Sequence, residues 1–93
     1  MAAILAKIQR KVLQGEFEFS YHCLLELADE NFMPSDVIAA ILNAKEFDKL
    51  TEDESHSRYA LYGFANDGRA MKVIVFLLQG KVFIKTIYEY FYE

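Results

Sequence analysis

Residues 57–90 read SRYALYGFANDGRAMKVIVFLLQGKVFIKTIYEY, and this stretch decides the fold. It contains three runs rich in β-branched and aromatic residues, at 57–64, 69–78 and 81–90, a composition typical of β-strands. Asp67-Gly68 and Gln79-Gly80 separate the runs and indicate tight hairpin turns. The sequence therefore predicts an antiparallel meander of three strands.

Two-residue turns would fix the register of this meander and the face on which each side chain lies. The expected cross-strand pairs are Val73 with Tyr62 and Thr86, Val75 with Ile84, and Met71 with Tyr88. The face expected to take the helices carries Arg58, Ala60, Tyr62, Phe64, Met71, Val73, Val75, Leu77, Val82, Ile84, Thr86 and Tyr88. The opposite face would carry Tyr59, Leu61, Lys72, Ile74, Phe76, Phe83, Lys85 and Ile87.

The first half of the chain has a helical pattern. Apolar residues at helical spacing predict a helix over 3–13 that ends at Gly15, a second helix capped by Ser20, and a third that begins at Pro34 and ends near residue 44. Residues 46–50 could form a short edge strand, and 51–57 is expected to be an acidic loop. The prediction is one α+β domain over 1–93, with two to three N-terminal helices packed on one face of a three- to four-stranded antiparallel sheet.

Composition limits the function classes. The chain has 93 residues, a net charge of −4 and one cysteine, Cys23. The negative total argues against a protein that coats nucleic acid, although residues 58–93 are positive. The longest apolar run is far shorter than the roughly 20 residues of a membrane span. We expect a cytoplasmic protein without membrane contact, in which Cys23 has no chemical role.

A series of short motifs runs in order along the chain: Ser20-x-His22, Asp36-Val37, Arg58, Gly63, Asp67-Gly68-Arg69 and Thr86-x-Tyr88. In this order, over about residues 4–90, they resemble a bacterial family of small domains of unknown function. That family is more distantly similar to BrnT-type and RelE-type toxins of toxin–antitoxin pairs. The resemblance implies a RelE-like or barnase-like fold and, in the toxin members, RNA cleavage without a metal or cofactor.

The resemblance also implies a catalytic set: His22, Arg58, Thr86 and Tyr88. Metal-independent RNA cleavage needs proton transfer and a cation that stabilises charge on the phosphate, which these residues could supply. Where the family usually has alanine and arginine in its Ser-x-His-Ala-x-x-Arg pattern, this chain has Cys23 and Glu26. The alternative is structural: His22 bonded to Glu26 or to backbone, Arg58 paired with the acidic loop, and Thr86 and Tyr88 lining the core.

A second group mixes cations with aromatic rings on the open sheet face: Lys72, Lys85, Tyr59, Phe76 and Phe83. Such a surface suits single-stranded RNA or a protein partner, and the net charge favours the partner, an antitoxin or a second copy of the chain. His56 lies in the acidic loop, but one histidine does not supply the ligands of a metal site, so we expect no metal and no cofactor. Two functions remain: a toxin-like endoribonuclease and a non-catalytic interaction module.

Overall fold

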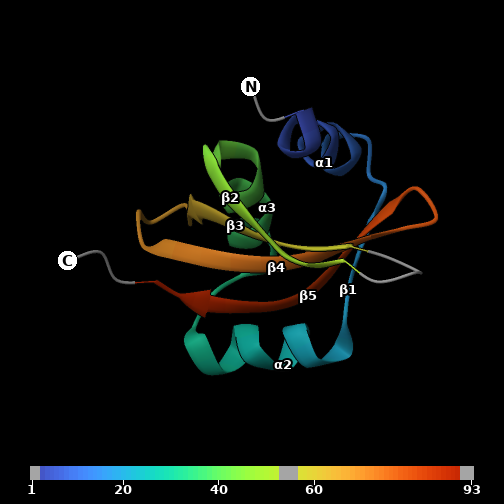
Figure 1. Ribbon diagram of the computed structural model, residues 1–93. Helices are drawn as coiled ribbons and strands as arrows, with labels where there is room; N and C mark the ends of the chain where they lie inside the picture. The colour runs from blue at the N-terminus through green and yellow to red at the C-terminus, as the bar shows by residue number, and fades with distance from the viewer. Residues whose placement is uncertain (1–2, 53–56, 91–93) are drawn as a thin grey trace.

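The structure, a computed structural model, describes residues 3–52 and 57–90 (Figure 1). These residues form three helices and five strands in one sheet. The helices are α1 (Ala3–Leu13), α2 (Tyr21–Glu30) and α3 (Pro34–Asn43). The strands are β1 (Phe17–Phe19), β2 (Glu46–Glu52), β3 (Ser57–Phe64), β4 (Ala70–Leu78) and β5 (Lys81–Glu89). The α+β class and the three helices are as predicted.

The sheet is larger than predicted and is mixed. Its strand order is β1-β5-β4-β3-β2, and β2 to β5 are antiparallel to their neighbours. β1, between α1 and α2, pairs with β5 in parallel, with Phe19 beside Ile84. β2 extends to Glu52 and β3 begins at Ser57, so these ends of the loop predicted at 51–57 are in strands, and residues 53–56 lie outside the described residues. The expectation of three to four antiparallel strands is corrected to four antiparallel strands plus a short parallel one.

The first hairpin differs from the expected two-residue turn. Ala65 and Arg69 pair across it, and the amide of Gly68, at φ +91°, donates to the Ala65 carbonyl. Three residues therefore form the loop, and Val73 pairs with Leu61 instead of Tyr62. Because a slip of one residue reverses the faces of a strand, Tyr59 and Leu61 point to the helices, and Arg58 and Tyr62 do not.

The second hairpin confirms the two-residue turn at Gln79-Gly80, both at positive φ, and the pair Val75 with Ile84. A bulge at Lys85 then shifts the register, so that Ile74 pairs with Thr86 and Val73 with Ile87. Met71 accordingly pairs with Glu89 instead of Tyr88. The bulge turns Thr86 and Tyr88 away from the helices and places Ile87, 1% exposed, in the core.

One hydrophobic core lies between the helices and one face of the sheet. Its fully buried large side chains include Ile8 of α1, Ile41 of α3, Leu61, Met71, Ile84 and Ile87. Figure 1 shows α3 behind β2 and β3, and α2 running along β5 at the other end of the sheet. Helices thus cover the core side, and the opposite face of the sheet is left without a helix over it.

Two polar contacts fix α3. Gln9 of α1 donates through Nε2 to the carbonyls of Ile41 and Ala44, at 3.0 Å each, where α3 ends. Asp36, 8% exposed, accepts from the amides of Met33 (2.8 Å) and Asn66 (3.0 Å), which ties the start of α3 to the β3–β4 loop. The first turn of α3 therefore holds the hairpin in place.

Gly63 allows α3 to lie directly on β3. A Cβ added there would stand 1.9 Å from the Ala40 carbonyl oxygen and 2.7 Å from Asn43 Oδ1. Asn43 also bonds both backbone groups of Phe64, at 2.8 Å each. The hairpin glycine of the motif series is therefore a requirement of close packing.

We predict that Gly63→Ala lowers the free energy of unfolding by about 3 kcal/mol, because α3 must shift to admit the methyl group. The matched control is Gly15→Ala. Gly15 has φ +80° and no atom near its added Cβ, so its substitution should cost about 1 kcal/mol of backbone strain. Urea unfolding of the three proteins gives both values, and equal losses for the two variants would contradict this account of Gly63.

Candidate functional site

Cross-strand pairing arranges the open face, defined as the sheet face turned away from the core, in rows. One row contains Arg58, Phe76 and Phe83; the next contains Ala60, Ile74 and Thr86; the third contains Tyr62, Lys72 and Tyr88. The middle row is buried, with Ala60 at 0% and Ile74 at 6% exposed. Larger side chains of the flanking rows therefore close over the small ones between them.

Arg58, Thr86 and Tyr88 lie on this open face and not on the helix-facing side as predicted. The three-residue loop reversed the faces of β3, and the bulge at Lys85 reversed the end of β5. Both changes move these residues from the helix-facing side to the open face, so the three residues still share one face. They share it with Lys72, Phe76 and Phe83, so the two predicted clusters become parts of one surface. Tyr59 leaves this surface, because it is 7% exposed and packs with Phe47 on the core side.

His22 joins the open face from the first turn of α2. Its Nε2 lies 3.2 Å from Glu26 Oε2, one helical turn further on, and its side chain is 70% exposed. The second Glu26 oxygen accepts a hydrogen bond from the Thr86 hydroxyl and one of 3.1 Å from the Ile87 amide. His22, Glu26 and Thr86 thus form a connected chain from α2 to β5.

These contacts determine which of the three side chains can reach a substrate. Thr86 is 6% exposed and holds Glu26, so it positions the carboxylate and does not present its hydroxyl to solvent. Glu26 in turn fixes the imidazole of His22. Nε2 is the imidazole nitrogen next to the Glu26 carboxylate, so Nδ1 is the one left for a substrate. The interpretation of His22 as a partner of Glu26 is therefore correct, and it is compatible with proton transfer at Nδ1.

Ser20 fixes the start of α2 as the helix signal predicted. Its Oγ accepts from the Cys23 amide (3.0 Å) and donates to the Lys85 carbonyl (2.7 Å), so the N-cap is also anchored at the bulge. Cys23 itself is fully buried. Burial, assisted by the charge of Glu26, raises the pKa of the Cys23 thiol to about 11, and such a thiol is unreactive near neutral pH.

A hollow of about 460 Å³, here called the His22 hollow, opens between the start of α2 and the β4–β5 hairpin. Its lining is Ser20, His22, Phe76, Leu78, Phe83 and Lys85. Two cations lie over the ring of Phe76: Lys85 Nζ is 5.1 Å from its centroid, and Arg58 Cζ is 5.6 Å from it. His22, Arg58 and Lys85 therefore surround one aromatic floor.

Tyr88 stands apart from this hollow. It lies two rows from Arg58 and one strand beyond β4, where Lys72 Nζ is 6.0 Å from its ring centroid. Four residues along a strand span about 13 Å, so Tyr88 and Arg58 are on opposite sides of the buried middle row. The structure joins His22 to Thr86 of the middle row through Glu26, places Arg58 in the first row, and leaves Tyr88 with Lys72 in the third.

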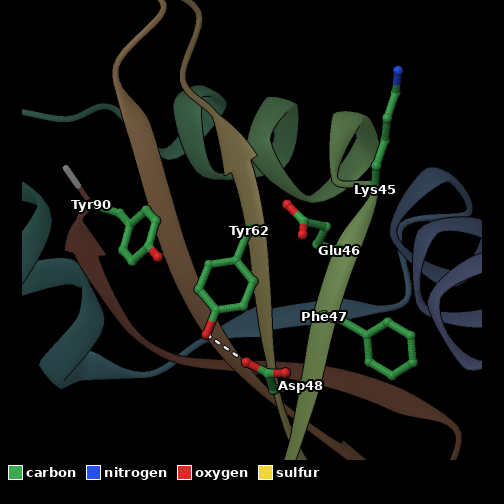
Figure 2. A pocket seen from close by; sticks show the side chains of 6 residues that line it. All are labelled: Lys45, Glu46, Phe47, Asp48, Tyr62 and Tyr90. Atoms are coloured by element: carbon green, nitrogen blue, oxygen red, sulfur yellow. Dashed lines mark hydrogen bonds between the residues drawn. The ribbon is translucent and has the colours of Figure 1, made fainter. Parts of the chain in front are cut away.

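The β2 end of the same face has the opposite charge. A second hollow there has a volume of about 450 Å³. Figure 2 shows the residues that line it: Lys45, Glu46, Phe47, Asp48, Tyr62 and Tyr90. The Tyr62 hydroxyl donates to Asp48 Oδ2 (2.8 Å), and the rings of Tyr62 and Tyr90 lie 5.3 Å apart. Partial burial and this hydrogen bond raise the pKa of Tyr62 to about 12. Tyr62 is therefore a fixed donor and not a base at neutral pH.

Arg69 is the main structural residue that the sequence did not identify as such. Its guanidinium donates to the carbonyls of Glu30 and Asn31 at the end of α2, at 3.2 and 2.8 Å, and lies 3.9 Å from the centroid of Phe32. Asp67 holds the same side chain through Nε at 2.8 Å. The Asp67-Gly68-Arg69 motif thus caps α2, and a basic residue that follows a turn was the available signal for it.

Two further features concern metals and membranes. Within the described part of the chain, no group of three His, Cys, Asp or Glu side chains is placed to hold a metal ion. His56 lies outside the described residues. No helix over residues 3–52 and 57–90 has both the length and the apolar character needed to cross a membrane.

The pKa of Tyr62 gives a prediction. Its folded value, about 12, exceeds the usual 10, so its contribution to stability is complete below pH 10 and disappears as the pH rises toward 12. A titration of tyrosinate absorbance should contain a step near pH 12 that Tyr62→Phe removes. Tyr21→Phe is the control, because Tyr21 is 77% exposed on α2, and this variant should keep the step. Persistence of the step in Tyr62→Phe would refute the assignment.

Comparison with known proteins identifies the family. The profile of a family described as "Domain of unknown function (DUF4258)" matches residues 19–89, from the end of β1 to the end of β5. No curated protein and no solved structure matches the chain. The matched segment is more than half of the chain and includes every residue that lines the His22 hollow. This chain therefore belongs to the DUF4258 family.

Proposed function

We propose that the protein is a toxin-like endoribonuclease that cleaves RNA without a metal, with His22 as the residue that transfers the proton. The observation that carries the proposal is the position of His22. This exposed imidazole lies next to Glu26 and lines a hollow together with Lys85, while Arg58 lies over the Phe76 ring of the same hollow. The resemblance of the motif series to RelE-type and BrnT-type toxins supports the same reaction class.

Each residue has a distinct role in this proposal. Nδ1 of His22 takes the proton of a ribose 2′-hydroxyl, and the oxygen then attacks the adjacent phosphorus. The bond to the 5′-oxygen of the next nucleotide breaks and that oxygen takes a proton from water, which gives a 2′,3′-cyclic phosphate and a free 5′-hydroxyl. His22 afterwards releases its proton to solvent. Lys85 and Arg58 stabilise the charge that develops on the phosphate. Glu26 and Thr86 are positioning residues. Lys72 and Tyr88 lie further along the face, where they would hold the RNA backbone beyond the cleaved bond.

The acidic end of the face restricts the path of the RNA. Glu46 and Asp48 of β2 repel phosphates, whereas Arg58, Lys72 and Lys85 attract them. We therefore expect RNA to follow β3, β4 and β5 and to avoid β2. The reaction also requires a location where RNA is present, in agreement with the expected cytoplasmic location.

Substitution of His22 tests the reaction. His22→Ala should reduce the cleavage rate of an unstructured RNA by about 10²–10⁴ in the presence of EDTA, since a general base is removed. Because the side chain is 70% exposed, the thermal unfolding midpoint should remain close to that of the wild type. Tyr21→Ala, on the neighbouring exposed position of α2, is the control and should cleave normally. Normal cleavage by His22→Ala would exclude His22 from the reaction.

A second function is favoured by one specific observation. Glu26 engages both His22 and Thr86, and exposed rings of Phe64 (46%), Tyr88 (49%) and Tyr90 (37%) give the other end of the face an apolar surface. Aromatic residues of this kind anchor protein interfaces. The alternative is a non-catalytic module that binds an antitoxin or a second copy of the chain.

Light scattering and expression distinguish the two functions. An interaction module that pairs with itself should be a dimer in solution, and Tyr88→Glu should convert it to a monomer, whereas Tyr21→Glu should not. Expression without growth arrest would agree with the module. Growth arrest that is relieved by the product of the adjacent reading frame, and lost in His22→Ala, would instead support the toxin.

A further inference from the structure

We infer that the His22 hollow holds one unpaired base of single-stranded RNA, stacked on Phe83 and bordered by Phe76 and Leu78, while Lys85 contacts the phosphate beside that base. This inference rests on the proposed function and names the form of RNA that the site accepts. It predicts that the protein distinguishes single-stranded RNA from duplex RNA and from a polyanion without bases.

The floor of the hollow is built for a flat apolar group. Phe76 of β4 and Phe83 of β5 are directly paired across the strands, so their side chains are neighbours on the open face. Leu78 extends the apolar wall toward the hairpin. Both rings are half-buried, which leaves part of their surface accessible from the hollow. Nucleobases present a π-face whatever their identity, and aromatic side chains are their usual stacking partners.

The charges around the floor select an anionic polymer over an apolar protein segment. Lys85 lines the hollow, and its Nζ lies 5.1 Å from the Phe76 centroid. Glu26 is turned to His22 and Thr86, and Glu18 pairs with Lys81 at 3.3 Å. A ligand with a flat apolar unit next to a negative charge therefore fits this site best, and a nucleotide of a single strand has this combination.

The polar groups of the hollow provide few contacts that could distinguish one base from another. Ser20 Oγ is occupied by the Lys85 carbonyl and the Cys23 amide, so it is not available to a base edge. Recognition by stacking and by a mobile ammonium group tolerates all four bases. A duplex does not offer a base to the hollow unless a base pair opens, which is energetically unfavourable. Binding should therefore depend more on whether the RNA is single-stranded than on its base sequence.

The test measures binding with an RNA that cannot be cleaved. A fluorescein-labelled 12-nucleotide 2′-O-methyl RNA lacks the free 2′-hydroxyl, so its anisotropy reports binding alone. Wild-type protein should bind the single strand at least tenfold more tightly than the duplex of the same sequence. Inorganic polyphosphate of similar charge should compete poorly. Equal binding of strand and duplex, or full competition by polyphosphate, would show contacts to phosphates alone and overturn the inference.

Two phenylalanine substitutions localise the contact. Phe83→Ala should weaken binding of the single strand about 5- to 150-fold, the loss expected for one stacked base. Phe64→Ala is the matched control, because Phe64 is 46% exposed at the acidic end of the same face, and it should bind as the wild type does. Circular dichroism of both variants checks that they are folded. A folded Phe83→Ala protein with unchanged affinity would refute the base-binding role.

The outcomes separate this inference from the proposed function. If the single strand binds through Phe83 but unmodified RNA is not cleaved, the base hollow stands and the nuclease proposal fails. Tyr21→Ala should bind the 2′-O-methyl strand as the wild type does, because Tyr21 is 77% exposed on α2 and does not line the hollow. If no RNA binds and Phe83→Ala converts a dimer to a monomer, the hollow is a protein contact and the inference is wrong.

Discussion

The hydrogen bonds from α2 to the edge of β5 are the constraint on which the functional end of this protein depends. β1 pairs with β5 only as far as Ile84, and beyond that point Ser20 satisfies the Lys85 carbonyl and Glu26 the Ile87 amide. Buried backbone groups without partners would cost about 1–3 kcal/mol each, so α2 completes the sheet edge that β1 leaves open. The same contacts fix the first turn of α2 and with it His22. Glu26 thus both completes the sheet edge and lies next to His22, the candidate base.

The bulge at Lys85 lies at the centre of this arrangement. Without it, Thr86 would point into the core and Ile87 to the open face; with it, Thr86 reaches Glu26 and Ile87 is buried. The exchange of faces that the bulge causes also affects the charge pattern of the open face. Cations of β3 and β5 border the aromatic floor at one end, and carboxylates of β2 surround Tyr62 at the other. A long anionic ligand can therefore occupy one part of the face only, and the acidic end is left for a different contact.

Most motif residues of the ordered series have structural tasks in this fold. Gly63 admits α3, Asp36 joins α3 to the hairpin, and Arg69 caps α2. Ser20 caps the same helix from its other end. His22 differs from these residues because its side chain is largely exposed and contributes nothing to the core. A function at the start of α2 would therefore depend on His22 and its surroundings, whereas the structural residues of the series maintain the fold whatever the activity.

The sequence by itself determined the features that depend on neighbouring residues. Helical spacing located α1 and α3, Ser20 located the start of α2, and Gln79-Gly80 located the β4–β5 turn, because each is a local preference of the backbone. The tertiary structure decided the face on which each predicted site residue lies. The three-residue loop at Asn66–Gly68 is held by Asp36, and the bulge at Lys85 by Ser20, through contacts 30 and 65 residues apart in the chain. β1 was missed because three residues between two helices carry too short a pattern, and its pairing with β5 is also a distant contact. A shift of one residue reverses the faces of a strand, and no local pattern encodes these long-range bonds. The bonds therefore decided that Arg58, Thr86 and Tyr88 lie on the open face and Tyr59 in the core.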